Sequence, residues 1–323
     1  MKKIRIAFSD FWDVFDPNEN FITDALKKNF EVEISNDPDF VFCSIFGRKY
    51  LKYDCARIFY TGENLEPDFN LVDYGMGFSR VDFYDRYLRL PHYVLYPRAC
   101  ELAQKKPYMT DEELLSRKFC NYVISNALSA DARSRMIAAL EKYKPLDSGG
   151  RYHNNVGGPV ADKIDFSKGY KFSLAFENSS SRGYTTEKIM ESFAAGNVPI
   201  YWGNPDIAKE FNPDSFINCH DFDSFDDVVE YVKKVDSDDE LYLRMAKAPI
   251  VKEDSGAAKC LESDYVADYL YHICSQDPKD AIRRNTIYMG EYYEDEARFH
   301  QKIDRFLRLP RRAVRGLHNR SVK

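Results

Sequence analysis

The chain has 323 residues, a length that suits two domains of ordinary size better than one hydrophobic core. Its hydrophobic content of 44% is that of a globular protein, and no segment approaches the roughly 18–20 apolar residues that span a bilayer. A net charge of −6 and the absence of a reader motif argue against nucleic acid as a partner. Seven scattered cysteines without zinc-type spacing predict reduced thiols in a cytoplasmic protein.

Strands and helices alternate in the first part of the chain. The N-terminus, MKKIRIAFSDFWD, has too short an apolar stretch for a signal peptide and predicts a strand over residues 4–8. A helix is predicted at about 18–30, and further strands are predicted at residues 32–35, 40–45, 58–61 and 74–78. Residues 101–118 are polar and charged, and we place the crossing between the two domains there.

A second alternating series begins at residues 120–125 and continues through a helix at about 130–143. It leads to the most informative stretch, FSLAFENSSSRGYTTEKIMESFAAGNVPIYWG at residues 172–203. An apolar strand ends there in Glu177-Asn178, a small-residue loop follows, and a helix begins at Thr186 and stops at Gly196-Asn197. The helix start carries a carboxylate and a cation, and anionic ligands bind at such positions in open parallel sheets.

The rest of the chain predicts a strand at 216–220, a helix from Ser224 and another at about 258–273. Residues 298–323 hold nine Lys or Arg and one acid, about +8. Apolar residues recur in this tail at near-helical spacing: Phe299, Ile303, Phe306, Leu307, Val314 and Leu317. Such a basic amphipathic tail suits an anionic membrane surface, although a solvated tail or a terminal helix packed on the acidic body would give the same pattern.

The block FEN…GYTTEKI…VPIYWGNP resembles the donor-binding signature of the α1,3/4-fucosyltransferases, glycosyltransferase family ten, especially its short bacterial members. Matching blocks extend over roughly residues 4–245: FYTGEN, DFNLVDYGMGF, DRYLRLP, SGGR.HNN.GGPV and FNPDSFIN. The resemblance implies a GT-B fold of the α/β class, with two Rossmann-like domains facing a cleft. We expect an acceptor-binding domain at 1–118, a GDP-fucose-binding domain at 119–285 and a helical, basic amphipathic tail at 286–323.

The resemblance implies an inverting α1,3-fucosyltransferase. It would transfer L-fucose from GDP-fucose to the GlcNAc or glucose of a lactosamine-type oligosaccharide, as in Lewis antigen or O-antigen synthesis on lipopolysaccharide. No cofactor is required, and stimulation by Mn²⁺ or Mg²⁺, described for relatives, stays open; no metal site is predicted. We expect a cytoplasmic protein that is peripheral on the inner membrane if its tail binds there. The alternatives are a GT-B transferase for another nucleotide sugar and an inactive relative that binds glycans.

The predicted catalytic base is Glu63, in the block FYTGEN. It follows a predicted strand that ends in glycine, so its side chain should emerge at the carboxyl edge of a sheet. The resembled family has its proposed base at the Glu of this block. Glu66 is the nearest rival, but it lies a further turn along the chain.

The predicted donor-binding residues combine cations for a diphosphate with polar groups for hydroxyls. They are Arg133, Asn178, Tyr184, Glu187 and Lys188. Glu187 and Lys188 are adjacent and so do not share a helix face, which would let one bind hydroxyls and the other phosphate. Arg135 replaces Arg133 if the helix register differs.

Secondary donor-binding candidates are Asn126, Arg151, Asn154, Asn155 and Glu177. The glycine pairs at 149–150 and 157–158 permit close backbone approach, although a purely structural turn explains the same residues. Glu177 either faces the nucleotide or only ends its strand. The acceptor should lie on rings of the first domain, such as Phe11, Trp12 or Tyr74.

Overall fold

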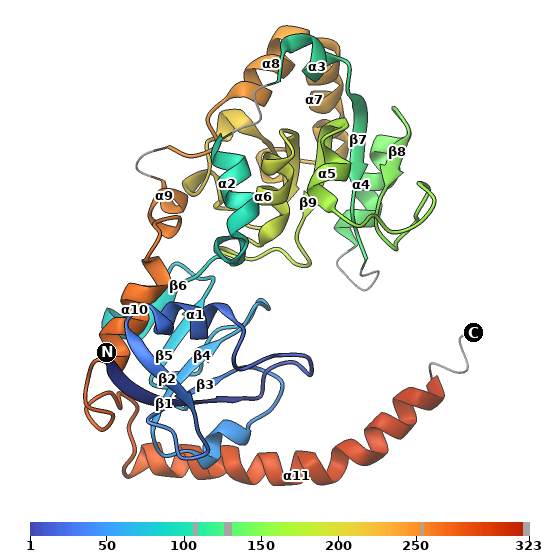
Figure 1. Ribbon diagram of the computed structural model, residues 1–323. Coiled ribbons are helices and arrows are strands. Elements are labelled where there is room, and N and C mark those ends of the chain that lie inside the picture. The colour runs from blue at the N-terminus through green and yellow to red at the C-terminus, as the bar shows by residue number, and fades with distance from the viewer. Residues whose placement is uncertain (106–108, 126–130, 253–254, 319–323) are drawn as a thin grey trace. The chain divides into compact units, whose positions relative to one another are not determined.

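The computed structural model describes residues 1–105, 109–125, 131–252 and 255–318, with side chains described through residue 303 (Figure 1). The strands are β1 (Lys2–Ser9), β2 (Phe30–Ile34), β3 (Phe40–Cys43), β4 (Ala56–Tyr60), β5 (Tyr74–Gly77), β6 (Tyr87–Arg89), β7 (Lys118–Tyr122), β8 (Leu146–Ser148), β9 (Tyr170–Phe176), β10 (Val198–Trp202) and β11 (Ile217–Asn218). The α-helices are α1 (Phe21–Lys27), α2 (Pro97–Lys105), α3 (Asp111–Leu115), α4 (Ala132–Glu141), α5 (Lys163–Ser167), α6 (Glu187–Ala194), α7 (Phe225–Ser237), α8 (Asp239–Lys247), α9 (Gly256–Cys260), α10 (Tyr265–Cys274) and α11 (Met289–His318).

The chain forms two compact units, each built on its own sheet. Unit 1 comprises Met1–Gly77, Val81–Leu88 and Val266–Lys323, and unit 2 comprises Phe78–Arg80 and Arg89–Tyr265. The six-stranded sheet of unit 1 has the order β2-β1-β3-β4-β5-β6, and β1 to β5 are parallel. Its central strands β3 and β4 are buried throughout, as parallel strands covered on both faces must be.

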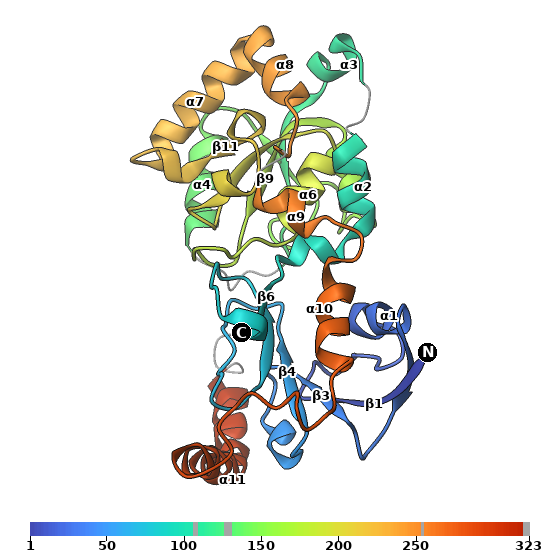
Figure 2. The ribbon, with the colours of Figure 1, turned by 90° about the vertical axis from the view of Figure 1, so that its left-hand side faces the viewer.

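The five-stranded sheet of unit 2 has the order β11-β10-β9-β7-β8, and its four strand pairs are parallel. Helices cover both of its faces (Figure 2). Apolar side chains of α4, α7 and α8 form the core on one face, and those of α2 and α6 form the core on the other. The α/β class and the two parallel sheets expected from the sequence are therefore confirmed.

The division into units differs from the predicted domain boundaries. The crossing expected at 101–118 lies instead at residues 78–89, because α2 packs on α6 and buries Ala99, Cys100 and Ala103 in the unit 2 core. The chain also returns to unit 1 at Val266, within the range assigned to the donor domain. This return is fixed by α10, since the Tyr269 hydroxyl donates to the carbonyl of Gly75 at 3.3 Å.

The C-terminal part contains more breaks than the sequence suggested. The helix expected at 258–273 is two helices, α9 and α10, separated at residues 261–264. The predicted tail begins as α11, whose Glu294 pairs with the buried Arg57 of β4 at 2.8 Å. None of the helices described is both long and apolar enough to cross a bilayer.

Candidate active site

The candidate donor site lies at the carboxyl edge of the unit 2 sheet, where the strand order reverses. β7 and β9 are neighbours, but the chain continues from β7 to β8 on one side and from β9 to β10 on the other. In open α/β sheets, ligands bind outside the carboxyl ends of strands at such a switch point. A pocket of about 180 Å³ lies here, lined by residues that follow β7 and β9 and by side chains of α4, α5 and α6.

A buried carboxylate organises the start of α6 beside this pocket. Glu177, directly after β9, has no exposed surface. Its Oε1 accepts the backbone N–H of Thr186 at 2.7 Å, and its Oε2 accepts the Thr186 hydroxyl at 2.6 Å. Thr186 is the N-cap residue of α6, but its side chain makes no capping bond to the helix. Glu177 therefore fixes this N-cap residue and joins the end of β9 to the helix.

The ammonium group of Lys188 lies in the same cluster. Its Nζ is 3.2 Å from Glu177 Oε2, 2.8 Å from Thr186 Oγ1 and 3.4 Å from Glu187 Oε1. Burial by itself would lower the pKa of Lys188, but the charges of Glu177 and Glu187 outweigh burial and raise this pKa above its ordinary value. Lys188 is thus a fixed cation in the pocket wall, the type of group that a diphosphate requires.

The carboxylate of Glu187 is held from the other side by His92. Glu187 Oε2 lies 3.4 Å from His92 Nδ1. Burial would raise the pKa of Glu187, but the hydrogen bond from His92 and the charge of Lys188 hold it well below the ordinary 4.5. Glu187 and Lys188 both line the pocket, although their adjacency predicted different directions. The long side chains turn back toward each other across the first helical turn.

Arg133, at the start of α4, supplies a second cation to the pocket. It is 4% exposed, and its Nη2 donates to the carbonyl of Phe176 at 2.7 Å and to Asn178 Oδ1 at 2.8 Å. Its Nε is buried and has no hydrogen-bond partner within the described chain. A buried donor without an acceptor is costly, which makes this nitrogen a candidate for a hydrogen bond to a ligand. The alternative, Arg135, instead lies over the ring of Phe225, 5.2 Å from its centroid.

Tyr184 lies in the loop that joins β9 to α6 and is 2% exposed. Its ring packs edge-to-face on Phe78, with the centroids 4.7 Å apart. It is not among the residues that line the 180 Å³ pocket. The structure therefore brings Arg133, Asn178, Glu187 and Lys188 to one pocket, while the donor contact of Tyr184 stays a prediction.

Hydrogen bonds within the loop that follows β8 explain why Asn154 and Asn155 occur there. Asn154 Nδ2 donates to the carbonyls of Ser148 and Gly150 at 3.1 and 2.7 Å, and its Oδ1 accepts the N–H of Gly158 at 2.7 Å. Asn155 pairs with the backbone of Ser148 and Leu146 at 2.7 and 2.8 Å. Both amides are thus occupied in holding the turn, which favours the structural reading of this segment.

The two other secondary candidates differ from these amides. Arg151 is exposed in the same loop, and it is not among the residues that line the donor pocket. Asn126 lies outside the described residues. Their predicted contacts with a nucleotide remain predictions.

The predicted base, Glu63, lies in unit 1. It follows β4 at the carboxyl edge of the parallel sheet, as the sequence predicted. Its side chain is exposed, and its backbone N–H donates to Thr61 Oγ1 at 3.1 Å. Its rival Glu66 is also exposed, and its Oε2 lies next to β5, 3.5 Å from the position that a Cβ on Gly77 would take. The fold thus directs Glu66 toward the neighbouring strand.

Aromatic rings cluster at the same edge of the unit 1 sheet. Phe8 of β1 stacks on Phe42 of β3 with centroids 5.4 Å apart, and Phe11 stacks on Phe15 at 4.2 Å. Trp12 joins this cluster and is 41% exposed. The expectation for Tyr74 is wrong, because its side chain is fully buried within β5 and cannot present a ring to an acceptor.

Comparisons with known proteins identify the family of this chain. The chain matches the model of the α-(1,3)-fucosyltransferase FucT N-terminal domain over residues 6–96. It matches that of the glycosyltransferase family 10 (fucosyltransferase) C-terminal region over residues 115–247. A crystal structure of an α1,3-fucosyltransferase with GDP-fucose superposes with a TM-score of 0.74 at 30% identity, covering 88% of this chain and 93% of that one. The chain belongs to glycosyltransferase family 10.

Two curated relatives are similar over shorter spans. The α-(1,3)-fucosyltransferase FucT of Helicobacter pylori is 36% identical over 283 residues, which cover 75% of this chain and 59% of that protein. The 4-galactosyl-N-acetylglucosaminide 3-α-L-fucosyltransferase 9 of Mus musculus is 35% identical over 130 residues, 39% of this chain and 35% of that protein. The matched part thus spans about three fifths of the length of the bacterial relative.

Several polar residues of this family 10 chain were missed from the sequence. Glu191 lies one turn after Glu187 and lines the pocket, where Lys163 pairs with it at 3.1 Å. The spacing of four residues on one helix was the available signal. Glu210 is fully buried and pairs with Arg89. No local pattern could have revealed it, because Arg89, Tyr93 and Thr185, which contact its carboxylate, come from distant segments.

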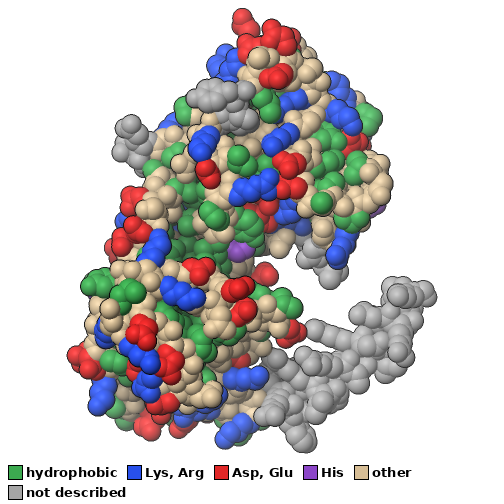
Figure 3. All heavy atoms as spheres, viewed as in Figure 1, with side chains coloured by type: hydrophobic (Ala, Val, Ile, Leu, Met, Phe, Trp, Pro, Cys, Tyr) green, Lys and Arg blue, Asp and Glu red, His purple; other side chains and the backbone are tan. Residues whose placement is uncertain are grey.

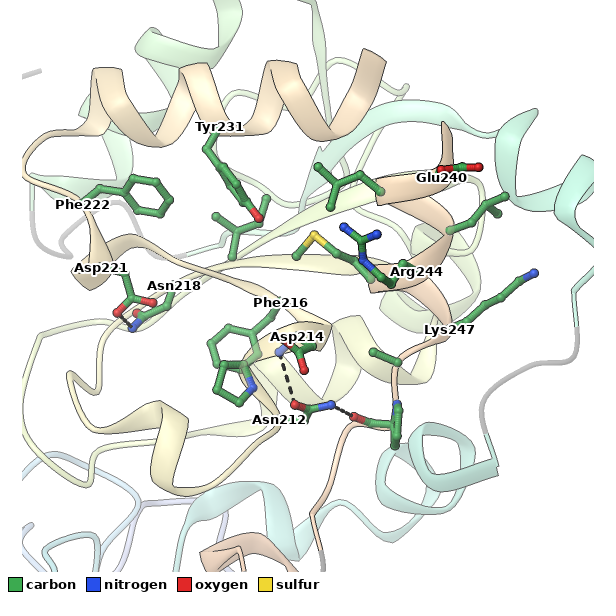
Figure 4. Close-up of a pocket in the computed structure, with 17 residues that line it drawn as sticks. Asn212, Asp214, Phe216, Asn218, Asp221, Phe222, Tyr231, Glu240, Arg244 and Lys247 are labelled. Atoms are coloured by element: carbon green, nitrogen blue, oxygen red, sulfur yellow. Dashed lines mark hydrogen bonds between the residues drawn. The ribbon is translucent and has the colours of Figure 1, made fainter. Parts of the chain in front are cut away.

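A larger pocket of unit 2, about 960 Å³, shares no residue with the donor pocket. It is lined by side chains around β11, α7 and α8, among them Phe222, Tyr231 and Arg244 (Figure 4). None of the predicted donor residues lies there. Within the described part of the chain, no three His, Cys, Asp or Glu side chains are placed to hold a metal ion.

Proposed function

We propose that this chain is an inverting α1,3-fucosyltransferase that uses GDP-fucose. The observation that carries the proposal is the presence of two cations, the partly buried Lys188 and the buried Arg133, in one pocket at the switch point of the unit 2 sheet. The unpartnered Arg133 Nε and the Lys188 ammonium are suited to the oxygens of a diphosphate. Family membership supports the choice of GDP-fucose as the donor.

The side chains of the donor pocket have different roles in binding the nucleotide and in stabilising it as a leaving group. Lys188 and Arg133 stabilise the negative charge that develops on GDP as the bond from the fucose anomeric carbon to the phosphate oxygen breaks. Glu187, kept ionised by His92 and Lys188, accepts hydrogen bonds from hydroxyl groups of ribose or fucose. Glu177 contacts neither substrate and positions Lys188 and Thr186.

Glu63 acts as the general base on the acceptor. Its carboxylate takes the proton of the acceptor hydroxyl while that oxygen forms a bond to the fucose anomeric carbon. The carbon–oxygen bond to GDP breaks in the same displacement, and the β-linked donor becomes an α-linked product.

The acceptor is proposed to be the GlcNAc or glucose of a lactosamine-type glycan, bound beside the aromatic cluster of Phe11 and Trp12. The test is incubation with GDP-fucose and a panel of lactosamine acceptors, with linkage analysis of the product. We expect an α1,3-linked fucose. Transfer from GDP-mannose or a UDP-sugar instead would favour another nucleotide sugar, and GDP-fucose binding without turnover would favour an inactive relative.

We also propose that the basic residues from 298 onward hold the protein on the cytoplasmic face of an anionic membrane. Phe299 and Ile303 of α11 are 58% and 39% exposed, which leaves apolar surface available beside the basic side chains. On the face of the molecule seen in Figure 3, basic and acidic side chains of the described residues intermingle. Deletion of residues 298–323 should release the protein from anionic vesicles, and unchanged binding would refute this.

A further inference from the structure

A second buried carboxylate of unit 2, Glu210, gathers donors from distant parts of the chain. It has no exposed surface. Its oxygens lie 2.8 Å from Asn204 Nδ2, 3.0 Å from Thr185 Oγ1, 3.2 Å from the Tyr93 hydroxyl and 3.5 Å from Arg80 Nη2, and they accept a further hydrogen bond from Arg89 Nη2. An isolated buried carboxylate would be costly, and these donors and two guanidinium groups compensate it.

The same donors hold the loop of residues 178–186, here called the donor loop, from two sides. Arg89 Nη2 donates to the carbonyl of Gly183 at 3.2 Å, and the N–H of Gly183 donates to Asn204 Oδ1 at 2.8 Å. Asn204 also donates to Thr185 Oγ1 at 3.1 Å. Tyr184 lies between these two fixed residues, and the N-cap of α6 follows immediately.

Gly183 shows how closely the donor loop is fitted. Its φ is +86°, a conformation that favours glycine, and a Cβ there would lie 2.4 Å from the carbonyl oxygen of Phe78. Arg89 Nε donates to that same carbonyl at 3.1 Å. The Glu210–Arg89 pair thus fixes both the loop and the backbone against which the loop packs.

Glu210 does not line the donor pocket, so any effect on the nucleotide must pass through the donor loop. We propose that Glu210 is a positioning residue that pre-orders the donor loop, and with it the start of α6, for the diphosphate of GDP-fucose. This inference rests on the proposed function. A loop ordered before binding spares the complex the entropy cost of ordering it, so the contribution belongs to nucleotide affinity.

The test compares GDP affinity, measured by titration calorimetry, with the KM and kcat for GDP-fucose. Glu210→Gln should raise the Kd for GDP and the KM about tenfold or more, because hydrogen bonds to a buried charge are lost. The kcat at saturating donor should stay within about twofold, since no group that contacts the reacting atoms changes. A loss in kcat with an unchanged KM would overturn the inference.

Two further variants keep the test decisive. Thr185→Val removes the loop contact to Glu210 but leaves the Glu210–Arg89 pair, so it should weaken GDP binding even if Glu210→Gln does not fold. Asp236→Asn is the matched control, because Asp236 is a buried carboxylate of unit 2 paired with Lys171 at 3.5 Å, away from the donor loop. It should lower stability without changing GDP affinity.

The outcomes separate this inference from the proposed function. If the wild-type protein binds GDP and the Glu210→Gln and Thr185→Val variants bind it equally well, only the positioning role is overturned. If the wild-type protein does not bind GDP, the proposed function fails and this inference with it. If Asp236→Asn weakens GDP binding as much as Thr185→Val does, general destabilisation explains the effect and the positioning role is overturned.

Discussion

The two proposed halves of the reaction are built very differently. In the donor cluster, Glu177, Thr186 and Arg133 are buried and Lys188 is partly buried. Hydrogen bonds join Glu177, Thr186 and Lys188 to one another, and Arg133 is held by the Phe176 carbonyl and Asn178. Glu63, by contrast, is exposed on a loop after β4. The difference indicates that the proposed diphosphate site is ordered before ligand binding, whereas the proposed base depends on the bound acceptor for its surroundings. Substitutions in the donor cluster should therefore change the affinity for GDP, whereas substitution of Glu63 should change kcat.

Replacing Glu63 should have the largest effect. Glu63→Gln removes the proton acceptor but keeps the size of the side chain, so kcat should fall about 1,000-fold while GDP affinity stays unchanged. Steady-state transfer assays and calorimetry with GDP measure the two quantities. Glu66→Gln is the matched control and should lose less than about threefold in kcat. Equal losses in both variants would contradict the assignment of Glu63.

Loss of the Lys188 cation should come next. Lys188→Met keeps the apolar stem but leaves Glu177 without its ammonium partner and the leaving group without a stabilising charge. We expect kcat/KM for GDP-fucose to fall about 100-fold. The same variant should bind GDP weakly, in contrast to Glu63→Gln. If Lys188→Met bound GDP as tightly as the wild type does, the assignment of nucleotide affinity to the donor cluster would be contradicted.

Arg133 should show a smaller, geometric effect. Arg133→Lys keeps the charge but loses the planar guanidinium, whose Nη2 bonds the Phe176 carbonyl and Asn178 while another nitrogen is left for a phosphate oxygen. GDP affinity should fall about tenfold. Arg135→Lys, on the same helix, should bind GDP as the wild type does. A reversed order of these two variants would place the diphosphate beside Phe225.

The smallest effect concerns stability and pH. The pKa of Glu187 is held below its ordinary 4.5 in the folded state, so its ionised form stabilises the fold at neutral pH. Glu187→Gln should therefore lower the melting temperature by about 3 °C at pH 7. As the pH falls below 4.5, the wild type loses this contribution and the two melting temperatures should converge. A difference that grows in acid would contradict the assigned sign.

Much of the fold was predictable because local patterns determine it. The end of the strand before Glu177-Asn178 and the start of the helix after Ser224 were predicted where they are observed, because an apolar run ends in polar residues at the first and a helix cap lies at the second. The domain division was not predictable, because the polar stretch at 101–118 suggested a linker and only the packing of α2 on α6 excludes it.

The donor site was predictable in part for the same reason. Glu187 and Lys188 follow a recognisable strand–loop–helix pattern, and Arg133 was placed by the family resemblance. The role of Glu177 was undecided in the sequence, because only folding brings its carboxylate to Thr186 and Lys188. The role of Glu210 could not be predicted from the sequence. Its partner Tyr93 lies far from it in the chain, and its partner Asn204 contacts it only once the loop has folded.

The structure of the protein crystallised with GDP would test the central claim most directly. The account predicts that oxygens of the diphosphate lie within hydrogen-bonding distance of both Arg133 Nε and Lys188 Nζ, at the carboxyl edge of β7 and β9. A diphosphate bound instead in the pocket around β11 and α8, or beside Arg151, with Arg133 Nε still unpartnered, would contradict it.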